Sequence, residues 1–455
     1  MRQSGLSLTF AGADGEVTGS AHFLRTALGG LLVDCGFFQG KRLAEAKNHD
    51  PFAFPVNGVA AVLLTHAHLD HCGRLPKLVK EGYQGPIYCT EATARLVELV
   101  LKDTVNVLSE HARQDGTLPL YGIEDVTQTL GLVRPVKLDS PFAPFSGAEA
   151  TFKEAGHILG SSWIQVETEG KVLVFSGDVG NAPSPLLPPP SRPNRADVVV
   201  CESTYGGQTH DTHESRLEAV HGAIDDVIKN RGVLLIPSFA MERTQELLFL
   251  IDALAAHHAI RDLPVFLDSP LAISVTDVYR EFTAEMRPEV AEQMQRGDDP
   301  FNFPFLKETR SPEASKAIRR VPGPKIVIAG AGMMEGGRIH HHLINELDKP
   351  TTTLLIVGFQ APGTLGRELA DGSKRVHVMG QELDVRAKVQ TIGAFSAHAD
   401  EPQILGWLSD IRRRPRQVFV VHGEIEKSKL LADAVKKRFD WLTALPELGQ
   451  TAAIS

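Results

Sequence analysis

The sequence predicts an α/β protein with more than one domain. With 455 residues, the chain exceeds the size of one ordinary hydrophobic core. Short apolar runs typical of buried strands alternate with amphipathic helical segments, and short loops connect them. Several of these runs end in histidine or a carboxylate. Ligand sites of α/β sheets lie at such strand ends, so the same pattern predicts where a functional site would be.

The composition is that of a globular protein, with 42% hydrophobic and 23% charged residues. The net charge of −9 argues against non-specific coating of nucleic acid. A local basic cleft beside metal cations would still bind phosphate. The four cysteines form no Cys-x-x-Cys pair, which favours a reducing compartment. We find no signal peptide and no membrane-spanning stretch, so we expect a cytoplasmic protein without membrane contact.

The first part of the chain contains three short strand-like runs separated by glycines. The third run, residues 31–34, ends in Asp34. A carboxylate at this position is suited to orient a metal-binding histidine, with the capping of a turn as the alternative.

The densest signal follows the apolar run at residues 59–64, where His66, His68, Asp70 and His71 lie within six residues. Three imidazoles and a carboxylate are costly to bury unless something satisfies them, and nitrogen plus carboxylate ligands suit zinc. In an extended loop His66 and His68 point the same way, whereas Asp70 and His71 lie around a bend. The loop therefore predicts two adjacent metal sites.

Helices are expected at residues 74–81 and 91–110, followed by a β-rich part with a hairpin at residues 162–176. His157 follows a strand before this hairpin, and Asp178 follows the hairpin directly. Each is weak evidence alone, but together they supply ligands that a two-metal site needs. Asp178 is suited to bridge two metals because a carboxylate has two oxygens.

A second α/β segment begins near residue 206, with helices expected at residues 216–229 and 243–257 and a parallel sheet. Its glycine-rich loops lack a complete dinucleotide fingerprint, but such loops present backbone N–H groups to phosphates. The triplet at residues 340–342 is expected to start a helix rather than to bind metal. The candidates for contact with phosphates are Arg243, Arg338, Thr364, Arg367 and Ser396.

The chain then returns to strand ends that carry histidine, at His398 and His422. His66-Ala-His68-Leu-Asp70-His71 resembles the signature of the metallo-β-lactamase superfamily. Glu202-Ser-Thr, Ser396-Ala-His398 and His422-Gly-Glu resemble motifs A, B and C of its β-CASP branch of nucleases. The resemblance covers nearly the whole chain.

This resemblance implies a metallo-β-lactamase αββα sandwich with an inserted α/β β-CASP domain. The sandwich would comprise residues 1–205 and 374–455, and the insertion residues 206–373. Two Zn²⁺ ions per chain are expected. The implied ligands are His66, His68 and His157 for one zinc, Asp70, His71 and His422 for the other, and Asp178 as the bridge. Asp34 would not bind a metal itself but would orient a ligand histidine by a hydrogen bond. His398 would be the general acid, held by Glu202, and Asp70 also counts among the catalytic residues.

The implied activity is a zinc-dependent ribonuclease that cleaves single-stranded RNA with a hydroxide held between the metals. The products would carry 5′-phosphate and 3′-hydroxyl ends. Endonuclease action is expected, and 5′→3′ exonuclease action and a homodimer stay open. His422 favours RNA, because DNA-acting members of the family tend to have an aliphatic residue there. The alternatives are a small-molecule metallo-hydrolase and a non-catalytic RNA-binding homologue.

Overall fold

The computed structural model describes residues 5–40, 45–210, 213–256, 263–392 and 396–455. The chain divides into two compact units, which are described separately. Unit 1 comprises Met1–Thr209 and His398–Ser455, and unit 2 comprises His210–Ala397. Unit 2 extends past the boundary expected at residue 373, because strand β19 (Lys388–Thr391) pairs in parallel with β16 (Thr353–Ile356) of unit 2.

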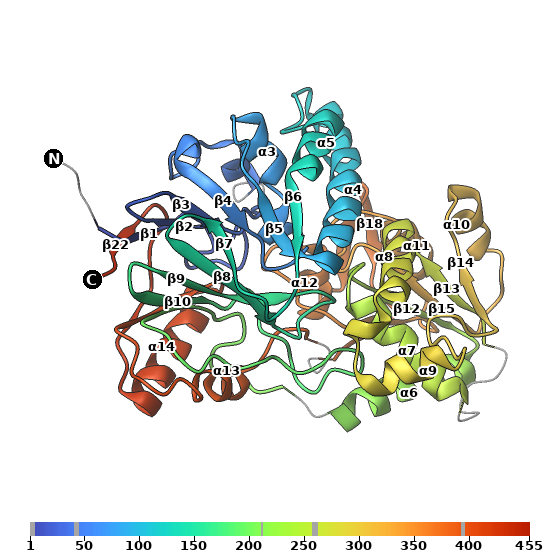
Figure 1. Ribbon diagram of the computed structural model, residues 1–455. Helices are drawn as coiled ribbons and strands as arrows, with labels where there is room; N and C mark the ends of the chain where they lie inside the picture. The colour runs from blue at the N-terminus through green and yellow to red at the C-terminus, as the bar shows by residue number, and fades with distance from the viewer. Residues whose placement is uncertain (1–4, 41–44, 211–212, 257–262, 393–395) are drawn as a thin grey trace. The chain divides into compact units, whose positions relative to one another are not determined.

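Unit 1 contains two seven-stranded sheets (Figure 1). The first has the spatial order β22 (Thr451–Ala453), β1 (Ser7–Phe10), β2 (His22–Arg25), β3 (Gly30–Val33), β4 (Val59–Leu63), β5 (Ile87–Thr90) and β6 (Val133–Val136). The second has the order β21 (Thr443–Ala444), β20 (Gln417–Val421), β11 (Val198–Glu202), β10 (Lys171–Phe175), β9 (Ser162–Thr168), β8 (Ala148–Glu154) and β7 (Phe142–Phe145).

The core of unit 1 lies between these sheets, because alternate side chains of each strand point to the facing sheet. Leu24, Leu31 and Leu63 from the first sheet pack in one buried cluster with Phe152 and Phe175 from the second. Burying this much apolar surface is the main stabilising contribution to the sandwich.

Helices cover both outer faces of unit 1. The helices α3 (Leu75–Lys80), α4 (Glu91–Asp115) and α5 (Ile123–Leu132) contact one another or the strands of the first sheet. Thr90 begins α4 by accepting a hydrogen bond from the Thr93 backbone N–H, and Gly116 ends it in the left-handed region at φ 67°. The helices α13 (Glu401–Leu408) and α14 (Ile425–Phe439) pack on the second sheet, where Trp407 and Val435 share a core with Val199. The order is therefore helices, sheet, sheet, helices, as expected for an αββα sandwich.

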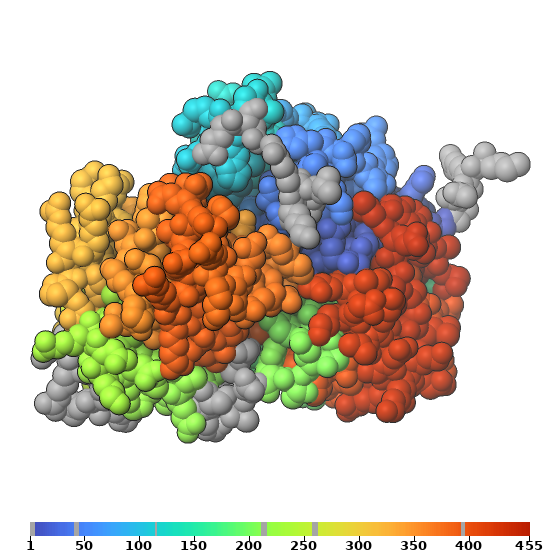
Figure 2. Space-filling model, turned by 180° about the vertical axis from the view of Figure 1, so that it is seen from behind, coloured from blue at the N-terminus to red at the C-terminus, as the bar shows by residue number. Residues whose placement is uncertain are grey.

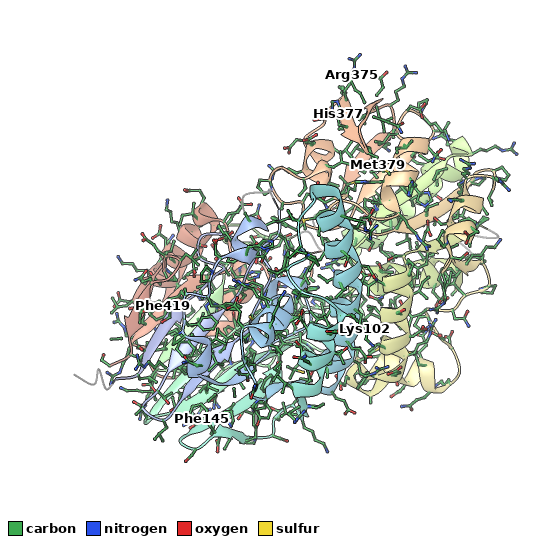
Figure 3. The ribbon with its side chains drawn as sticks, turned by 90° about the horizontal axis from the view of Figure 1, so that it is seen from above. Lys102, Phe145, Arg375, His377, Met379 and Phe419 are labelled. Carbon is green, nitrogen blue, oxygen red and sulfur yellow. The ribbon has the colours of Figure 1, made fainter. Side chains whose placement is uncertain are left out.

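Unit 2 is built on one six-stranded parallel sheet. Its order is β14 (Leu306–Glu308), β13 (Val265–Asp268), β15 (Lys325–Ala329), β12 (Val233–Pro237), β16 and β19. Its α-helices are α6 (His213–Asn230), α7 (Arg243–Ala256), α8 (Pro270–Glu281), α9 (Pro288–Gln295), α10 (Pro312–Ile318), α11 (Ile339–Glu346) and α12 (Leu365–Ala370). A hairpin of β17 (Arg375–Val378) and β18 (Gln381–Asp384) buries Val376 and Val378, while Arg375, His377 and Met379 lie on its exposed side (Figure 3).

Most of the expected elements are present, with small corrections. The hairpin at residues 162–176 is formed by β9 and β10, and the triplet at residues 340–342 lies in α11, as predicted. On the two long helices α4 and α6, Val107 and Leu217 are 45% and 39% exposed although both are apolar. Among the described residues, no helix combines the length and apolarity that crossing a bilayer requires.

Candidate metal centre

The polar side chains of the predicted site meet at one edge of the unit 1 sandwich. His66 and His68 lie in extended chain just after β4, and the short helix α2 (Leu69–Cys72) turns Asp70 and His71 to the same place. The loop after β3 holds α2 through backbone hydrogen bonds from Cys35 N–H to His71 O (2.8 Å) and from Phe37 N–H to Leu69 O (2.9 Å). A Cβ at Gly36 would lie 1.5 Å from the carbonyl oxygen of Asp70, so only glycine permits this approach.

The first cluster consists of His66, His68, His157 and one oxygen of Asp178. Nδ1 of His68 lies 3.1 Å from Nε2 of His66 and 3.1 Å from Nε2 of His157. Oδ2 of Asp178 lies 3.4 Å from each of these two Nε2 atoms. A tetrahedral zinc with bonds of about 2.05 Å separates its ligand atoms by about 3.3 Å, so these four atoms fit one metal ion.

The second cluster consists of Asp70, His71 and His422, next to the other oxygen of Asp178. Nε2 of His71 and Nε2 of His422 are 3.0 Å apart. Oδ1 of Asp178 lies 3.3 Å from the first and 3.5 Å from the second, and Oδ2 of Asp70 lies 3.6 Å from Nε2 of His422. Oδ1 of Asp178 is buried and has no hydrogen-bond partner among the described residues, as expected for an atom reserved for a cation.

A layer of hydrogen bonds behind the clusters fixes the imidazole rings. Asp34 Oδ2 lies 2.7 Å from Nδ1 of His71. Thr65 Oγ1 lies 3.0 Å from Nδ1 of His66 and 2.9 Å from Asp34 Oδ2. The Thr65 hydroxyl therefore donates to Asp34 and accepts from His66. Nδ1 of each ring therefore faces its hydrogen-bond partner, and Nε2 faces the cluster.

Thr204 provides the same support for His422, with Oγ1 3.2 Å from Nδ1. Neither Thr65 nor Thr204 was among the expected site residues. The available signal was their position, because Thr65 directly precedes His66 and Thr204 lies in the Glu-Ser-Thr motif. Asp34 and His422 have left-handed backbone conformations, with φ of 61° and 51°. Such strain in non-glycine residues is concentrated at functional sites.

Burial sets the protonation of the clustered side chains. It lowers the pKa of His66 to about 3 and that of His68 to about 4, so both imidazoles are neutral near pH 7. Burial raises the pKa of Asp178, but the surrounding histidines outweigh it and hold that pKa well below its ordinary value. Burial also lowers the pKa of His71, but Asp178 and Asp34 outweigh it and raise the pKa of His71 well above its ordinary value. A metal ion would have to displace that proton.

His398 and Glu202 lie beside the clusters. Nδ1 of His398 is 3.1 Å from Glu202 Oε2 and 3.8 Å from Asp178 Oδ2. Glu202 is held in turn by the Val179 backbone N–H, which donates to its Oε1 over 2.7 Å. Burial lowers the pKa of His398, but the Glu202 and Asp178 carboxylates outweigh it and raise that pKa to about 9. His398 is therefore a protonated, partly exposed side chain at the site.

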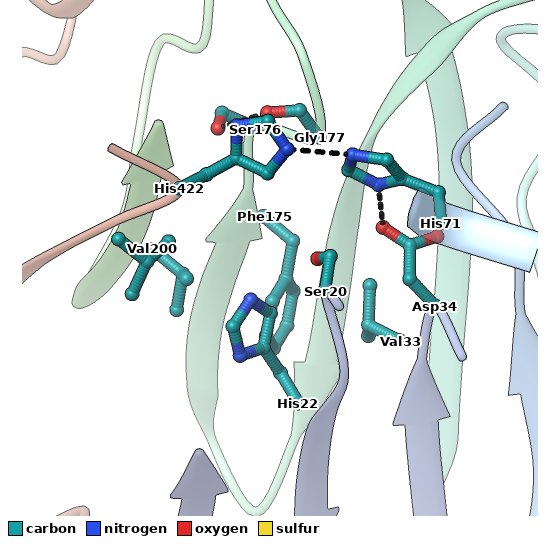
Figure 4. A pocket seen from close by; sticks show the side chains of 11 residues that line it. Ser20, His22, Val33, Asp34, His71, Phe175, Ser176, Gly177, Val200 and His422 are labelled. Carbon is teal, nitrogen blue, oxygen red and sulfur yellow. Dashed lines mark hydrogen bonds and ion pairs between the residues drawn. The ribbon is translucent and has the colours of Figure 1, made fainter. Parts of the chain in front are cut away.

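A small cavity of about 10 Å³ lies behind the second cluster, between the two sheets (Figure 4). Its lining includes Ser20, His22 and Ser176 as well as His71 and His422. The volume matches about one water molecule, and Nδ1 of buried His22 has no partner among the described residues. Burial lowers the pKa of His22 to about 3, so this ring is neutral. Sequence reasoning missed His22, because a histidine inside an apolar strand resembles a core residue.

Comparison with known proteins places the chain in a family. The metallo-β-lactamase superfamily model matches residues 14–238, the Beta-Casp domain model matches residues 244–369, and a model described as a Zn-dependent metallo-hydrolase RNA specificity domain matches residues 382–446. Ribonuclease TTHA0252 of Thermus thermophilus is 43% identical over 92% of this chain and 95% of that protein. The chain belongs to the β-CASP branch of the metallo-β-lactamase superfamily.

Other β-CASP relatives agree with this placement. An RNase J-like protein of Methanocaldococcus jannaschii is 31% identical over 97% of this chain and 98% of its own length. A transcription termination factor FttA of Methanosarcina mazei is 31% identical over 95% of this chain and 69% of its own. A protein of unknown function from Enterococcus faecalis shares the fold alone, with 10% identity and a TM-score of 0.54 over 99% of this chain and 100% of that one. The expected family, fold class and enzyme class are confirmed.

In unit 2, the side chains predicted to contact phosphate have partners within the protein. Arg243 is buried and paired with Glu246. Arg338 donates to Asp268 over 2.7 Å and to the carbonyl oxygen of Arg310 over 2.9 Å.

Two other predicted phosphate contacts, at the beginning of α12, also have partners within the protein. Thr364 begins α12 by accepting a hydrogen bond from the Arg367 backbone N–H. The half-exposed side chain of Arg367 is paired with Asp371 at 2.9 Å. These four residues, Arg243 and Arg338 included, stay predictions as phosphate contacts.

Two further predictions concern Ser396 and the histidine triplet at residues 340–342. Ser396 is buried and lies two positions before His398 in the chain. The histidine triplet, which was not expected to bind metal, makes hydrogen bonds of its own. His340 is bound to Met334 O and His342 to Asp268, each at 2.7 Å. Among the described residues, none of the triplet joins a group of metal-ligating side chains.

Proposed function

We propose that this protein is a zinc-dependent ribonuclease that hydrolyses phosphodiester bonds of single-stranded RNA. Its expected products carry 5′-phosphate and 3′-hydroxyl ends. The observation that carries the proposal is the shared carboxylate of Asp178, whose two oxygens belong to two adjacent sets of ligand atoms. Such paired sites are typical of enzymes that hydrolyse phosphate esters.

The residues present fit two divalent cations. His66, His68 and His157 with Oδ2 of Asp178 would hold one, and Asp70, His71 and His422 with Oδ1 of Asp178 would hold the other. Imidazole and carboxylate ligands with no thiolate suit zinc. When bound, the two cations lower the pKa of a water molecule and neutralise charge on a phosphodiester.

The protein's own side chains would handle the protons. Glu202 holds His398 through Nδ1 and favours its protonated form, so His398 is the candidate general acid for the departing 3′ oxygen of the RNA. Asp34 and Thr65 keep the ligand rings oriented while charge changes at the site.

RNA is proposed as substrate for three reasons. The relative that is 43% identical is named a ribonuclease, and the family model at residues 382–446 is described by RNA specificity. His422 occupies motif C, where RNA-acting members resemble this chain. The four cysteines are free and buried, which fits the reducing cytoplasm where RNA is processed.

The test uses a single-stranded RNA in linear and circular form, beside the same sequence as DNA. We expect the zinc-loaded protein to cut the circular RNA, which only an endonuclease attacks, to leave DNA intact, and to stop when a chelator is added. His398→Ala should lose activity and keep its metal. His377→Ala, on an exposed strand position of unit 2, is the matched control and should retain activity. A zinc-loaded protein that cuts no RNA would refute the proposal.

A further inference from the structure

Unit 1 carries a dense group of positive charges that has no part in the metal centre. The loop after α13 contains four arginines in five residues, and the last turn of α14 ends in three more cations. All seven side chains belong to exposed residues. We name this group the C-terminal basic cluster; it consists of Arg412, Arg413, Arg414, Arg416, Lys436, Lys437 and Arg438.

The two segments of the cluster lie together in the fold. Arg414 is paired with Asp440, the residue that ends α14, at 3.1 Å. The Val418 backbone N–H donates to Leu442 O over 2.8 Å, and Val418 pairs with Thr443, so the end of α14 lies beside the beginning of β20. Figure 2 shows this C-terminal segment, in red, as a broad exposed surface.

Most of this charge is not neutralised within the protein. Among the described residues, the single ion pair of the cluster is that of Arg414 with Asp440. Arg416 donates to the carbonyl oxygen of Ser455 over 2.6 Å. Seven cations gathered on a chain of net charge −9 form a local positive field that attracts polyanions.

Aromatic residues accompany the cations. The Arg438 guanidinium lies over the ring of Phe439, 5.3 Å from its centroid. Phe439 stacks on Trp441 with centroids 4.5 Å apart and an angle of 22°. Phe439 is partly exposed. Trp441 is buried in the core, so Phe439 is the ring of this pair that a base can reach. Cations beside an accessible aromatic ring are the combination by which proteins bind single-stranded nucleic acid without base readout.

The cluster and the metal centre lie at opposite ends of the same strand. β20 begins next to Arg416 and ends next to His422, and its five residues span about 17 Å at a rise of about 3.3 Å per residue. The family model described by RNA specificity, residues 382–446, contains both segments of the cluster. An RNA strand in the metal centre therefore has a basic surface within reach on the same unit.

We propose that the C-terminal basic cluster is a second RNA-binding surface. At a distance from the metal centre, it binds the phosphate backbone of long substrates whose scissile bond lies in the metal centre. This inference rests on the proposed ribonuclease function. It predicts tighter binding of long than of short RNA. It also predicts that this difference depends steeply on salt, because each neutralised phosphate releases counterions.

The test replaces four cations that form no ion pair with the described residues, giving R412E/R413E/K436E/K437E. For an RNA of about 40 nucleotides, we expect KM to rise about tenfold or more with kcat unchanged. The slope of log affinity against log salt concentration should become less steep by about 3. Each phosphate contact to a single strand contributes about 0.7 to this slope, and the variant loses four such contacts. An RNA of about 3 nucleotides, too short to span the ~17 Å of β20 that separates the metal centre from the cluster, should be cut as by the wild type.

The matched control reverses four exposed cations elsewhere on unit 1, in R25E/R113E/R134E/K137E. An equal rise in KM for this control would overturn the proposal, because global charge would then explain the effect. Tighter binding of polyglutamate than of RNA at equal charge would also overturn it in favour of an acidic protein partner. Fluorescence anisotropy of labelled RNA measures binding independently of cleavage. A cluster that does not contribute to RNA binding is therefore distinguished from a protein that binds RNA but does not cut it.

Discussion

Asp34 Oδ2 accepts a hydrogen bond from Nδ1 of His71 over 2.7 Å, with both side chains buried. This contact selects the tautomer that leaves Nε2 of His71 free for a cation. Asp34→Asn offers an amide whose oxygen still accepts, but it removes the negative charge that strengthens the bond. We expect metal affinity to fall about 10- to 100-fold, measured by competition with a chromogenic zinc chelator. Wild-type affinity in this variant would show that the charge of Asp34 is not needed.

The shared carboxylate predicts an asymmetry between ligand variants. Asp178→Ala removes one atom from each cluster and should lower the metal content from about two ions per chain to nearly none. His66→Ala affects the first cluster alone and should retain about one ion per chain. Metal content after dialysis is measured by atomic emission, with the exposed residue Asp433 changed to Asn as control. Equal loss in Asp178→Ala and His66→Ala would mean that the two clusters bind metal as one cooperative site.

Glu202→Gln should shift the pH dependence of cleavage. Burial lowers the pKa of His398, and the Glu202 carboxylate is the largest contribution that raises it. Without that charge, His398 loses its proton at lower pH, so the alkaline limb of the activity profile should move toward neutral pH. At pH 7 we expect kcat to fall about 10²- to 10⁴-fold, with metal content unchanged. If activity falls at every pH and the alkaline limb of the profile stays in place, Glu202 only positions His398.

Asp268 in unit 2 should be important for stability. It is fully buried and bonded to Arg338, His342, Thr309 and Ser315. Asp268→Ala leaves buried partners without their carboxylate and should cost about 3–5 kcal/mol of unfolding free energy. Asp277→Ala, which breaks half-exposed ion pairs, is the control and should cost less than about 1 kcal/mol. Urea denaturation followed by fluorescence gives both values.

The same carboxylate should make the stability of unit 2 sensitive to acid. Burial raises the pKa of Asp268, but hydrogen bonds from His342 and its other partners outweigh it and hold the pKa below its ordinary value. A depressed pKa stabilises the fold above the unfolded value of about 3.9, and this stabilisation is lost as pH falls toward the folded value. Asp268→Asn should therefore weaken the loss of stability below about pH 4. An unchanged acid dependence would contradict this assignment.

Much of the fold could be predicted, and so could the proximity of the site residues. The apolar runs indicate the strands, and the histidines and carboxylates that follow these runs indicate the site. His66, Asp178 and His422 each follow a buried apolar run, and parallel neighbours such as β11 and β20 bring such ends together. Thr65 and Thr204 could not be identified, because their role depends on which atoms face them across the sheet. The predicted phosphate contact Arg338 illustrates the same limit, since its partner Asp268 lies 70 positions earlier in the chain.

The division of unit 1 into two chain segments has a consequence for synthesis. His71 and His422 touch across 351 positions of sequence, and His398 belongs to the later segment as well. A chain still emerging from the ribosome lacks β20 and His422, and with them a complete second cluster, until both have been translated. The metal centre proposed for hydrolysis is therefore completed only after both segments of unit 1 have been made.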